Sequence, residues 1–287
     1  MKKVFKKILC FSLLSFSLFK IEKVQSLVPY YYFPTKKTLE RESLSIGKNA
    51  YELLYFGEYE KSLSLAKLAL TINKKDENLW LLFAEAQIAN NLYINALTSL
   101  SKAHKINSNN SETYFTKSNV YLKINQLKNA KISLTKGLEI EPKNYKAIFQ
   151  LGNIILMEKN YSEAIKLFDQ SVKIRPDFWQ GINNQALAYF EKSNINLSRK
   201  YFEKAISIQE NAEPLLGLAS CLRIKDIKLA LTLAKKALAK DPNYVSYEYR
   251  KEQLWGEKLQ ASTEKLLKNP ELQKDVILAK SKVEMSS

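Results

Sequence analysis

The sequence predicts an all-α solenoid built from repeated pairs of antiparallel helices. Three observations lead to this fold class. The 287 residues include only seven Gly and seven Pro, which is too little turn punctuation for a chain of many strands. Apolar residues make up 46% of the chain, so its composition is that of an ordered protein. Small and bulky residues also recur at a fixed spacing of 34 residues, which indicates an internal repeat.

The N-terminal residues have the pattern of a secretory signal. Met1–Lys7 carries four lysines, and Ile8–Phe19 is an apolar stretch too short for the ~20 residues of a membrane-spanning helix. Val24–Ser26 offers a small-residue cleavage site. We therefore expect residues 1–26 to be a signal peptide and the mature protein to be extracytoplasmic, in a periplasm or an equivalent lumen. Lys20, Glu22 and Lys23 are unusual before a cleavage site, so an uncleaved N-terminal anchor and a cytoplasmic protein remain alternatives.

Residues 27–42 precede the repeats and are expected to form an aromatic segment and a capping helix. Leu27–Pro34 (LVPYYYFP) is kept out of a helix by its two prolines. Its large side chains avoid water, so we expect them either to cover the open end of the first repeat or to form an association surface. Thr35–Glu42 is expected to lead into the first helix.

Five columns of equivalent residues lie in phase along the chain. Helices approach closely only where side chains are small, so the three small columns predict helix crossings. The two bulky columns predict the fillings between the crossings. The small columns are Ala50, Ala84, Ser118, Gly152 and Ala186; Ser62, Ala96, Ala130, Ala164 and Ser198; and Ala69, Ala103, Gly137, Ser171 and Ala205. The bulky columns are Tyr59, Tyr93, Leu127, Tyr161 and Ile195; and Ile72, Ile106, Ile140, Ile174 and Ile208.

The spacing resembles the tetratricopeptide repeat (TPR) family, and in particular its exported bacterial members. The fourth repeat shows the pattern most fully, with Leu151-Gly152, Tyr161, Ala164, Phe168 and Pro176. The resemblance covers about 70% of the chain and implies a right-handed superhelical solenoid of about six helix-turn-helix TPR repeats with helical caps at both ends. We place the TPR array at residues 43–244, with repeats at 43–76, 77–110, 111–144, 145–178, 179–212 and 213–244.

The C-terminal end departs from the repeat pattern. The sixth repeat is about two residues short, so we expect a tighter turn between its helices. Residues 245–287 are expected to form C-terminal capping helices. The first is an amphipathic helix over 245–268 that is broken at Asn269-Pro270, and a short helix follows over 271–283.

The sequence offers little to catalytic chemistry. His104 is the only histidine, and Cys221 is the only cysteine after residue 26. One histidine and one cysteine make neither a tetrahedral metal site nor a nucleophile–base pair. A buried, structural thiol is the favoured interpretation of Cys221. We expect no enzymatic activity, no cofactor and no metal.

Binding is the function that the resemblance favours. In this family the first helices of successive repeats line a concave groove. Amide side chains that recur along such a groove can donate to and accept from an extended peptide backbone, and Phe115 and Phe149 would add apolar pockets. The predicted peptide-groove residues are Tyr51, Tyr55, Phe115, Asn119, Lys123, Phe149, Gln150, Asn153, Met157, Gln180, Asn183 and Asn184.

One subclass of the family holds a C-terminal carboxylate with lysines, an arginine and two asparagines. Asn153 and Asn184 match two of these positions, but Phe149 stands where a lysine is needed. The sixth repeat also lacks the matching basic pair. We therefore do not expect this chain to be a carboxylate clamp.

Charge adds a weaker indication about partners. The formal net charge is +16, and residues 111–176 carry eleven Lys and Arg against six Asp and Glu. An acidic partner or an anionic membrane surface would be attracted to these middle repeats, although solvated lysines on outer helix faces also explain the excess. Nucleic acid is not expected, because export argues against it and aromatic residues are not interleaved with the lysines as stacking platforms.

Our main hypothesis is a scaffold that binds peptide segments of other proteins during assembly or maintenance of an envelope or membrane complex. The alternatives are a basic cytoplasmic protein associated with anions or nucleic acid, and an accessory subunit of an enzyme. The sequence does not identify the partner.

Overall fold

The structure is a computed structural model that describes residues 34–286 of the chain. The predicted signal peptide, 1–26, and the aromatic segment up to residue 33 lie outside the described residues. The chain separates into two units, Met1–Arg41 and Glu42–Ser287. In the first unit, the Thr38 backbone N–H donates to the Thr35 hydroxyl oxygen at 3.2 Å, which caps the start of a helix.

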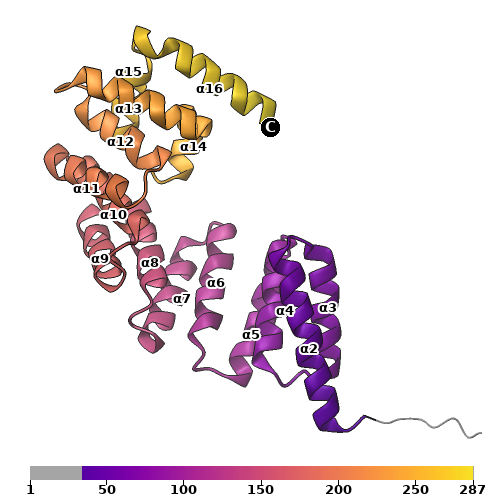
Figure 1. The fold of residues 1–287 in the computed structure, drawn as a ribbon. Helices are drawn as coiled ribbons and strands as arrows, with labels where there is room; N and C mark the ends of the chain where they lie inside the picture. Colours follow the sequence, from indigo (N-terminus) through magenta and orange to yellow (C-terminus); the bar gives the residue numbers. More distant parts are fainter. Residues whose placement is uncertain (1–33, 287) are drawn as a thin grey trace, which may run out of the picture. The chain divides into compact units, whose positions relative to one another are not determined.

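The described residues contain fifteen α-helices and two short 3-10 helices, and no strand lies among them (Figure 1). Within residues 34–286, none of the helices has the length and apolar character needed to cross a membrane. The first twelve α-helices are α2 (Lys36–Tyr55), α3 (Tyr59–Ile72), α4 (Glu77–Ala89), α5 (Tyr93–Ile106), α6 (Ser111–Lys123), α7 (Leu127–Ile140), α8 (Tyr145–Met157), α9 (Tyr161–Ile174), α10 (Trp179–Glu191), α11 (Ile195–Ile208), α12 (Ala212–Leu222) and α13 (Ile227–Lys240). The remaining elements are η1 (Pro242–Val245), α14 (Tyr247–Glu252), α15 (Glu257–Leu267), η2 (Pro270–Leu272) and α16 (Gln273–Ser286).

Helices α2 to α13 form six consecutive pairs, and each helix of α4–α13 packs on its neighbours in the chain (Figure 1). The core is correspondingly divided into several small clusters along the first repeats and one larger cluster that runs from α10 to α16. Leu100 and Val120 belong to one cluster, Leu134 and Ile154 to the next, and Ile155 and Phe168 to a third. The predicted all-α solenoid is therefore confirmed.

The small columns lie at the helix crossings, as the sequence predicts. All fifteen of their residues are buried. Three of the four serines in these columns donate to a backbone carbonyl: Ser62 Oγ to that of Ala50 at 2.7 Å, Ser171 Oγ to that of Tyr145 at 2.9 Å, and Ser198 Oγ to that of Ala186 at 2.9 Å. Ser118 is the exception, because its Oγ is buried and has no hydrogen-bond partner.

The turn inside each of the first five pairs contains one residue in the left-handed conformation. These residues are also 34 apart, and their φ angles lie between 57° and 79°. Only glycine adopts this conformation freely, and asparagine tolerates it better than other residues. The residues are Gly57, Asn91, Asn125, Lys159 and Ser193.

Helix starts are fixed by recurring caps. The side-chain oxygens of Asp76, Asn110 and Asn144 accept backbone N–H bonds at the starts of α4, α6 and α8. Phe178 occupies the same place before α10 and makes no such bond. Its ring packs instead against Tyr145 and Phe149, at centroid distances of 5.1 Å and 4.9 Å.

The sixth pair corrects one expectation. Its inter-helix turn is not tighter, because four residues, 223–226, separate α12 from α13, against three in the preceding pair. The shortening lies in α12 itself, which has 11 residues where α10 has 13. The described turn also lacks the left-handed residue of the other five.

The expected single helix over 245–268 is wrong, because the chain breaks it at Gln253–Gly256 into α14 and α15. Leu254 takes a left-handed φ of 65° at this break. Its side chain joins the cluster of Ile155 and Leu156, while Trp255 is buried at 4% exposure. Tertiary packing therefore overrides the helical pattern at this point.

One buried arginine holds together the C-terminal segment, which comprises residues 242–286. Arg250 is fully buried. Its Nη1 donates to the carbonyls of Tyr244 and Val245 at 2.7 Å and 3.0 Å, and its Nε donates to Gln260 Oε1 at 2.8 Å. Its Nη2 pairs with Glu264. The guanidinium thus ties η1, α14 and α15 to one another.

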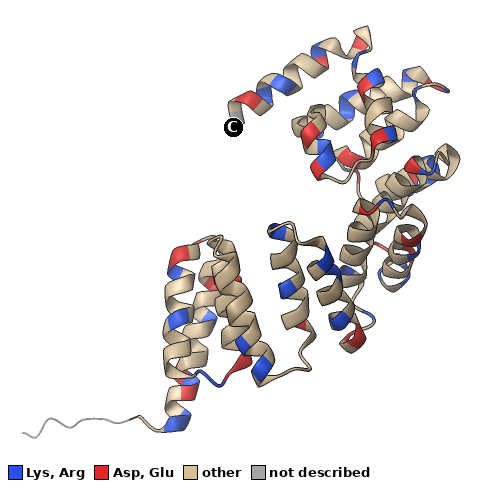
Figure 2. Cartoon of the chain, turned by 180° about the vertical axis from the view of Figure 1, so that it is seen from behind, with Lys and Arg blue, Asp and Glu red and all other residues tan. Residues whose placement is uncertain are grey.

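Charged residues are spread over the helices, with Asp and Glu between Lys and Arg (Figure 2). Many of their pairs join exposed side chains within one helix, such as Lys173 with Asp169. Exposed pairs of this kind add little stability. The buried columns and clusters hold the array together.

Candidate functional site

Amide side chains on α6, α8 and α10 form hydrogen bonds from one repeat to the next. Gln150 Nε2 donates to Asn119 Oδ1 at 3.1 Å, and Asn184 Nδ2 donates to Asn153 Oδ1 at 2.8 Å. Both bonds join residues 31 apart, so neighbouring repeats make the same contact twice. The four amides therefore lie along the same helix faces as a row of donors and acceptors, which is the arrangement that an extended backbone can bind.

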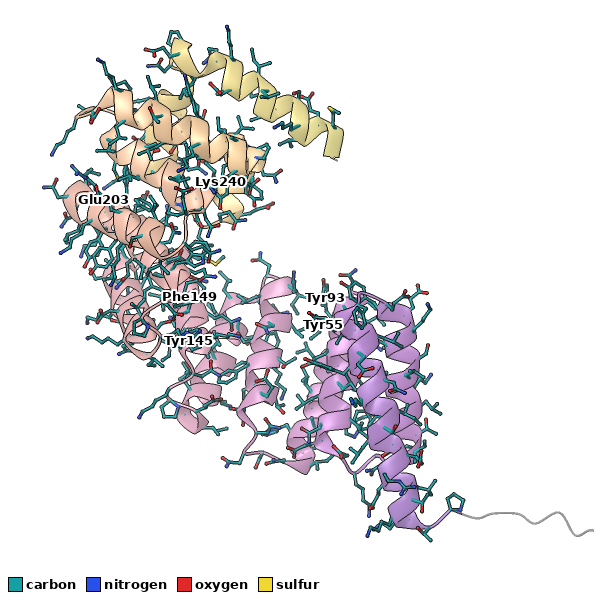
Figure 3. The ribbon with its side chains drawn as sticks, viewed as in Figure 1. Tyr55, Tyr93, Tyr145, Phe149, Glu203 and Lys240 are labelled. Carbon is teal, nitrogen blue, oxygen red and sulfur yellow. The ribbon has the colours of Figure 1, made fainter. Side chains whose placement is uncertain are left out.

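The two phenylalanines that were predicted as apolar pockets behave differently. Phe149 is partly exposed, and its ring lies 4.9 Å from that of Phe178 and 5.7 Å from that of Phe168, with Tyr145 one turn earlier on α8 (Figure 3). Phe115 is 6% exposed and packs over Gly137, where a Cβ atom would lie 2.4 Å from its ring. Phe115 is thus a core residue that a ligand cannot reach, and Phe149 alone offers an accessible aromatic surface.

A cavity of about 460 Å³ opens beside the amides. Its walls combine one residue of α6, the exposed sides of α8 and α10, one residue of α12 and the C-terminal segment. Six predicted groove residues contribute to it: Phe149, Gln150, Asn153, Met157, Gln180 and Asn184. The sequence did not single out the other eight: Leu122, Ile154, Trp179, Glu213, Tyr244, Glu252, Gln253 and Leu254.

The C-terminal segment closes one end of this face. Helix α15 packs on α10 and α12, the first helices of the fifth and sixth pairs. The Glu191 carboxylate accepts the backbone N–H groups of Lys258 and Leu259 at 3.3 Å and 3.0 Å, which caps α15. Ser262 Oγ donates to the Ser220 carbonyl at 3.0 Å. The open part of the face therefore lies on α6 and α8 and ends at the cavity.

Glu213 is the acidic group at the meeting point of these elements. Trp255 Nε1 donates to its Oε1 at 3.0 Å. Burial raises the pKa of the Glu213 carboxyl to about 7, against hydrogen bonds from Trp255, Asn183 and Tyr244 that lower it. Burial also raises the pKa of the Tyr244 hydroxyl, and the Glu213 charge adds to that rise. Among the ion pairs of residues 34–286, none includes Glu213.

Besides Phe115 and Asn119, four other predicted groove residues do not line the cavity. Tyr51 lines a separate cavity of about 410 Å³ on α2 and α4. Tyr55 is 79% exposed at the end of α2 (Figure 3), and Lys123 is exposed at the end of α6. Asn183 is fully buried, and its Nδ2 donates to Asn184 Oδ1 at 3.2 Å. Asn183 therefore orients the Asn184 amide from inside the core and does not face a ligand.

No group of three His, Cys, Asp or Glu in the described part of the chain is arranged to hold a metal ion. Cys221 is buried, and burial raises its pKa to about 12, so the thiol stays protonated and unreactive. The expected burial of Cys221 is confirmed. The arrangement can bind and orient a ligand, and it offers no activated nucleophile.

The model of a tetratricopeptide repeat family matches residues 111–144 and 180–211. The two matched segments coincide with α6–α7 and α10–α11, whose helix pairs have the geometry of the rest of the array. These two segments are tetratricopeptide repeats. The TPR is generally a non-catalytic interaction module.

Solved structures give the same fold. A tetratricopeptide repeat protein from Parabacteroides merdae matches with a TM-score of 0.61 at 16% identity, over 83% of this chain and 99% of that chain. PilW, a type IV pilus biogenesis factor, matches with 0.59 at 21% identity, over 82% and 98%. YrrB, described as a TPR protein with an unusual peptide-binding site, matches with 0.50 at 22% identity, over 71% and 98%. Comparison with curated protein sequences gives no significant match.

Proposed function

We propose that this TPR protein is a non-catalytic scaffold that binds an extended peptide segment of a partner protein. The segment lies across α6, α8 and α10 and ends at the cavity. The observation that carries this proposal is the repeated amide pair, Asn119 with Gln150 and Asn153 with Asn184. A peptide backbone would exchange hydrogen bonds with these amides, while its side chains enter the cavity beside Phe149.

The comparisons support a peptide ligand and an envelope setting without assigning either. YrrB is named for its peptide-binding site, and PilW is named for pilus biogenesis. We propose that this protein likewise holds segments of partner proteins during assembly or maintenance of an envelope or membrane complex. The excess of lysine over residues 111–176 would favour an adjacent anionic surface.

Selection from a displayed library of random, capped dodecapeptides tests the binding function. The immobilised protein comprises residues 27–287. We expect a set of enriched peptides whose binding falls at least about tenfold when Asn119 and Asn153 are both replaced by Ala, because each lost amide removes backbone hydrogen bonds. Asn129 and Gln170 are exposed amides on α7 and α9, so their double replacement by Ala is the matched control.

Equal binding by the two double variants would reject the groove as the binding surface. Failure to enrich any peptide would reject the peptide-binding function itself. N-terminal sequencing of the natural protein tests the setting: we expect a start at or near Leu27, and a start at Met1 with cytoplasmic fractionation would contradict export.

A further inference from the structure

The cavity at the end of the amide row differs in charge from the rest of the protein. The chain carries 45 Lys and Arg against 29 Asp and Glu. Yet no Lys, Arg or His of the described residues lines this cavity, whereas Glu213 and Glu252 both do. In a chain with a net charge of +16, a cavity whose charged lining residues are all acidic is a local reversal of sign.

Three aromatic side chains also line the cavity. Phe149 comes from α8, Trp179 from the start of α10 and Tyr244 from η1. Ring faces attract cations through their quadrupole, most strongly when the cation is withdrawn from water. Carboxylates and aromatic rings together suit a positively charged side chain with an apolar stem, since the stem contacts the rings while the charge reaches the acid.

Glu213 is the carboxylate that the charged end of such a side chain would reach. Its neighbours hold it in place through neutral donors, with Trp255 Nε1 at 3.0 Å from its Oε1. Neutral donors orient a carboxylate but do not neutralise it, and no ion pair in residues 34–286 supplies a cation to it. Burial raises the pKa of the Glu213 carboxyl to about 7, and only neutral hydrogen-bond donors oppose that rise.

We propose that the cavity receives a lysine or arginine side chain of the bound peptide, with its stem between Phe149 and Trp179 and its charge paired with Glu213. This inference rests on the proposed peptide-binding function and adds the chemistry of one peptide side chain. An acidic side chain is repelled from the cavity, and an apolar side chain leaves Glu213 uncompensated.

Glu213→Gln separates this role from a purely structural one. Glutamine keeps the shape and the acceptor for Trp255 Nε1, so the C-terminal segment retains its anchor. Only the charge is lost. Glu139→Gln, on an exposed residue of α7, is the matched control for the change in net charge.

The peptides enriched from the dodecapeptide library provide the probes. We expect an Arg or Lys at one fixed position in most of them. Glu213→Gln should weaken the tightest such peptide at least about tenfold, as for a charge-assisted bond, and Glu139→Gln should change its binding less than twofold. The same peptide with citrulline in place of the arginine should bind wild type weakly and be insensitive to Glu213→Gln.

Two outcomes would overturn the inference, and they differ in what else they reject. Enriched peptides without a fixed cation, bound equally by Glu213→Gln but weakened by the Asn119 and Asn153 double variant, would leave the groove function standing. A library that enriches no peptide would reject the groove function and the cation site together. A melting temperature of Glu213→Gln no lower than that of wild type shows that weaker binding does not come from unfolding.

Discussion

Replacement of Gly152 by Ala tests the packing that sets the distance between helices in the fourth repeat. A Cβ at this position would lie 2.6 Å from Phe168 Cε1 and 2.8 Å from Cδ1, well inside an ordinary carbon contact of about 3.5–4.0 Å. Phe168 is fully buried, so its ring has no free space into which to turn. The new methyl group must therefore push α8 and α9 apart.

Two opposing effects decide the size of the change. Alanine stabilises a helix interior by about 1 kcal/mol relative to glycine. Overpacking of a well-filled core costs about 1–3 kcal/mol. We expect overpacking to win, with a net loss of about 1 kcal/mol in the free energy of unfolding, measured by urea denaturation with far-UV circular dichroism.

A double-mutant cycle isolates the cause. Phe168→Leu removes the ring that the methyl group meets, so in that background Gly152→Ala should stabilise by about 1 kcal/mol, through helix propensity alone. The coupling between the two sites is then about 2 kcal/mol. Phe115 lies over Gly137 and not over Gly152, so Phe115→Leu is the control and should show no coupling to Gly152→Ala. Stabilisation by Gly152→Ala in the wild-type chain, with zero coupling to Phe168, would refute the assigned contact.

Three further predictions concern the turns, the C-terminal segment and pH. Asn125→Ala should lower the free energy of unfolding by about 1 kcal/mol, because alanine tolerates the left-handed φ of 57° poorly, while Asn125→Gly should be neutral or stabilising; equal effects in urea titrations would contradict this. Arg250→Met should cost about 3 kcal/mol by stranding the buried acceptors around it and Glu264, and hydrogen exchange should show the loss first in α14 and α15; uniform protection would exclude it. Because burial raises the folded pKa of Glu213 to about 7, its protonated form should contribute about 3 kcal/mol to the free energy of unfolding. This contribution is fully present below pH ~4.5 and is lost as pH rises through about 7. Tyr244 and Glu252 are the other titratable groups that line the same cavity. Melting temperatures across this range should fall in wild type and stay flat in Glu213→Gln, and parallel curves would contradict the assignment.

Most of the fold could be predicted from the repeat columns, because each column has one physical role. Ala96, Ala130 and Ala164 are buried at crossings where a larger side chain would not fit, so their spacing is visible in the sequence alone. The left-handed turn column was less visible. Glycine and asparagine mark it at three positions, but Lys159 and Ser193 occupy the others and carry no such signal.

The difference between Phe115 and Phe149 has a cause that the sequence contains. Both hold the same place in their repeats. Gly137 leaves space beneath Phe115, but Ser171 occupies the corresponding place in the fourth repeat, and its hydroxyl donates to the Tyr145 carbonyl at 2.9 Å. Phe149 therefore stays at the surface. The size of the facing residue on the second helix was the signal that could have separated the two.

The remaining half of the cavity could not be read from the repeat pattern. Trp179 and Glu213 occupy the first positions of their repeats, where Tyr145 and Ser111 show no consistent chemistry. Leu254 and its neighbours reach the cavity only because the chain breaks at a left-handed leucine, a conformation that no local preference favours. Contacts between the C-terminal segment and α8 depend on the folded array, and a sequence pattern within one segment does not encode them.

Photo-cross-linking of a library-selected peptide to the protein tests the central claim most directly. The peptide carries a benzophenone side chain at successive positions in turn, and cross-linked residues are identified by peptide mass spectrometry. The account predicts cross-links on α6, α8 and α10, centred on Gln150, Asn153 and Met157, that disappear in the Asn119 and Asn153 double variant. Cross-links confined to the second helices α7, α9 and α11 would contradict it.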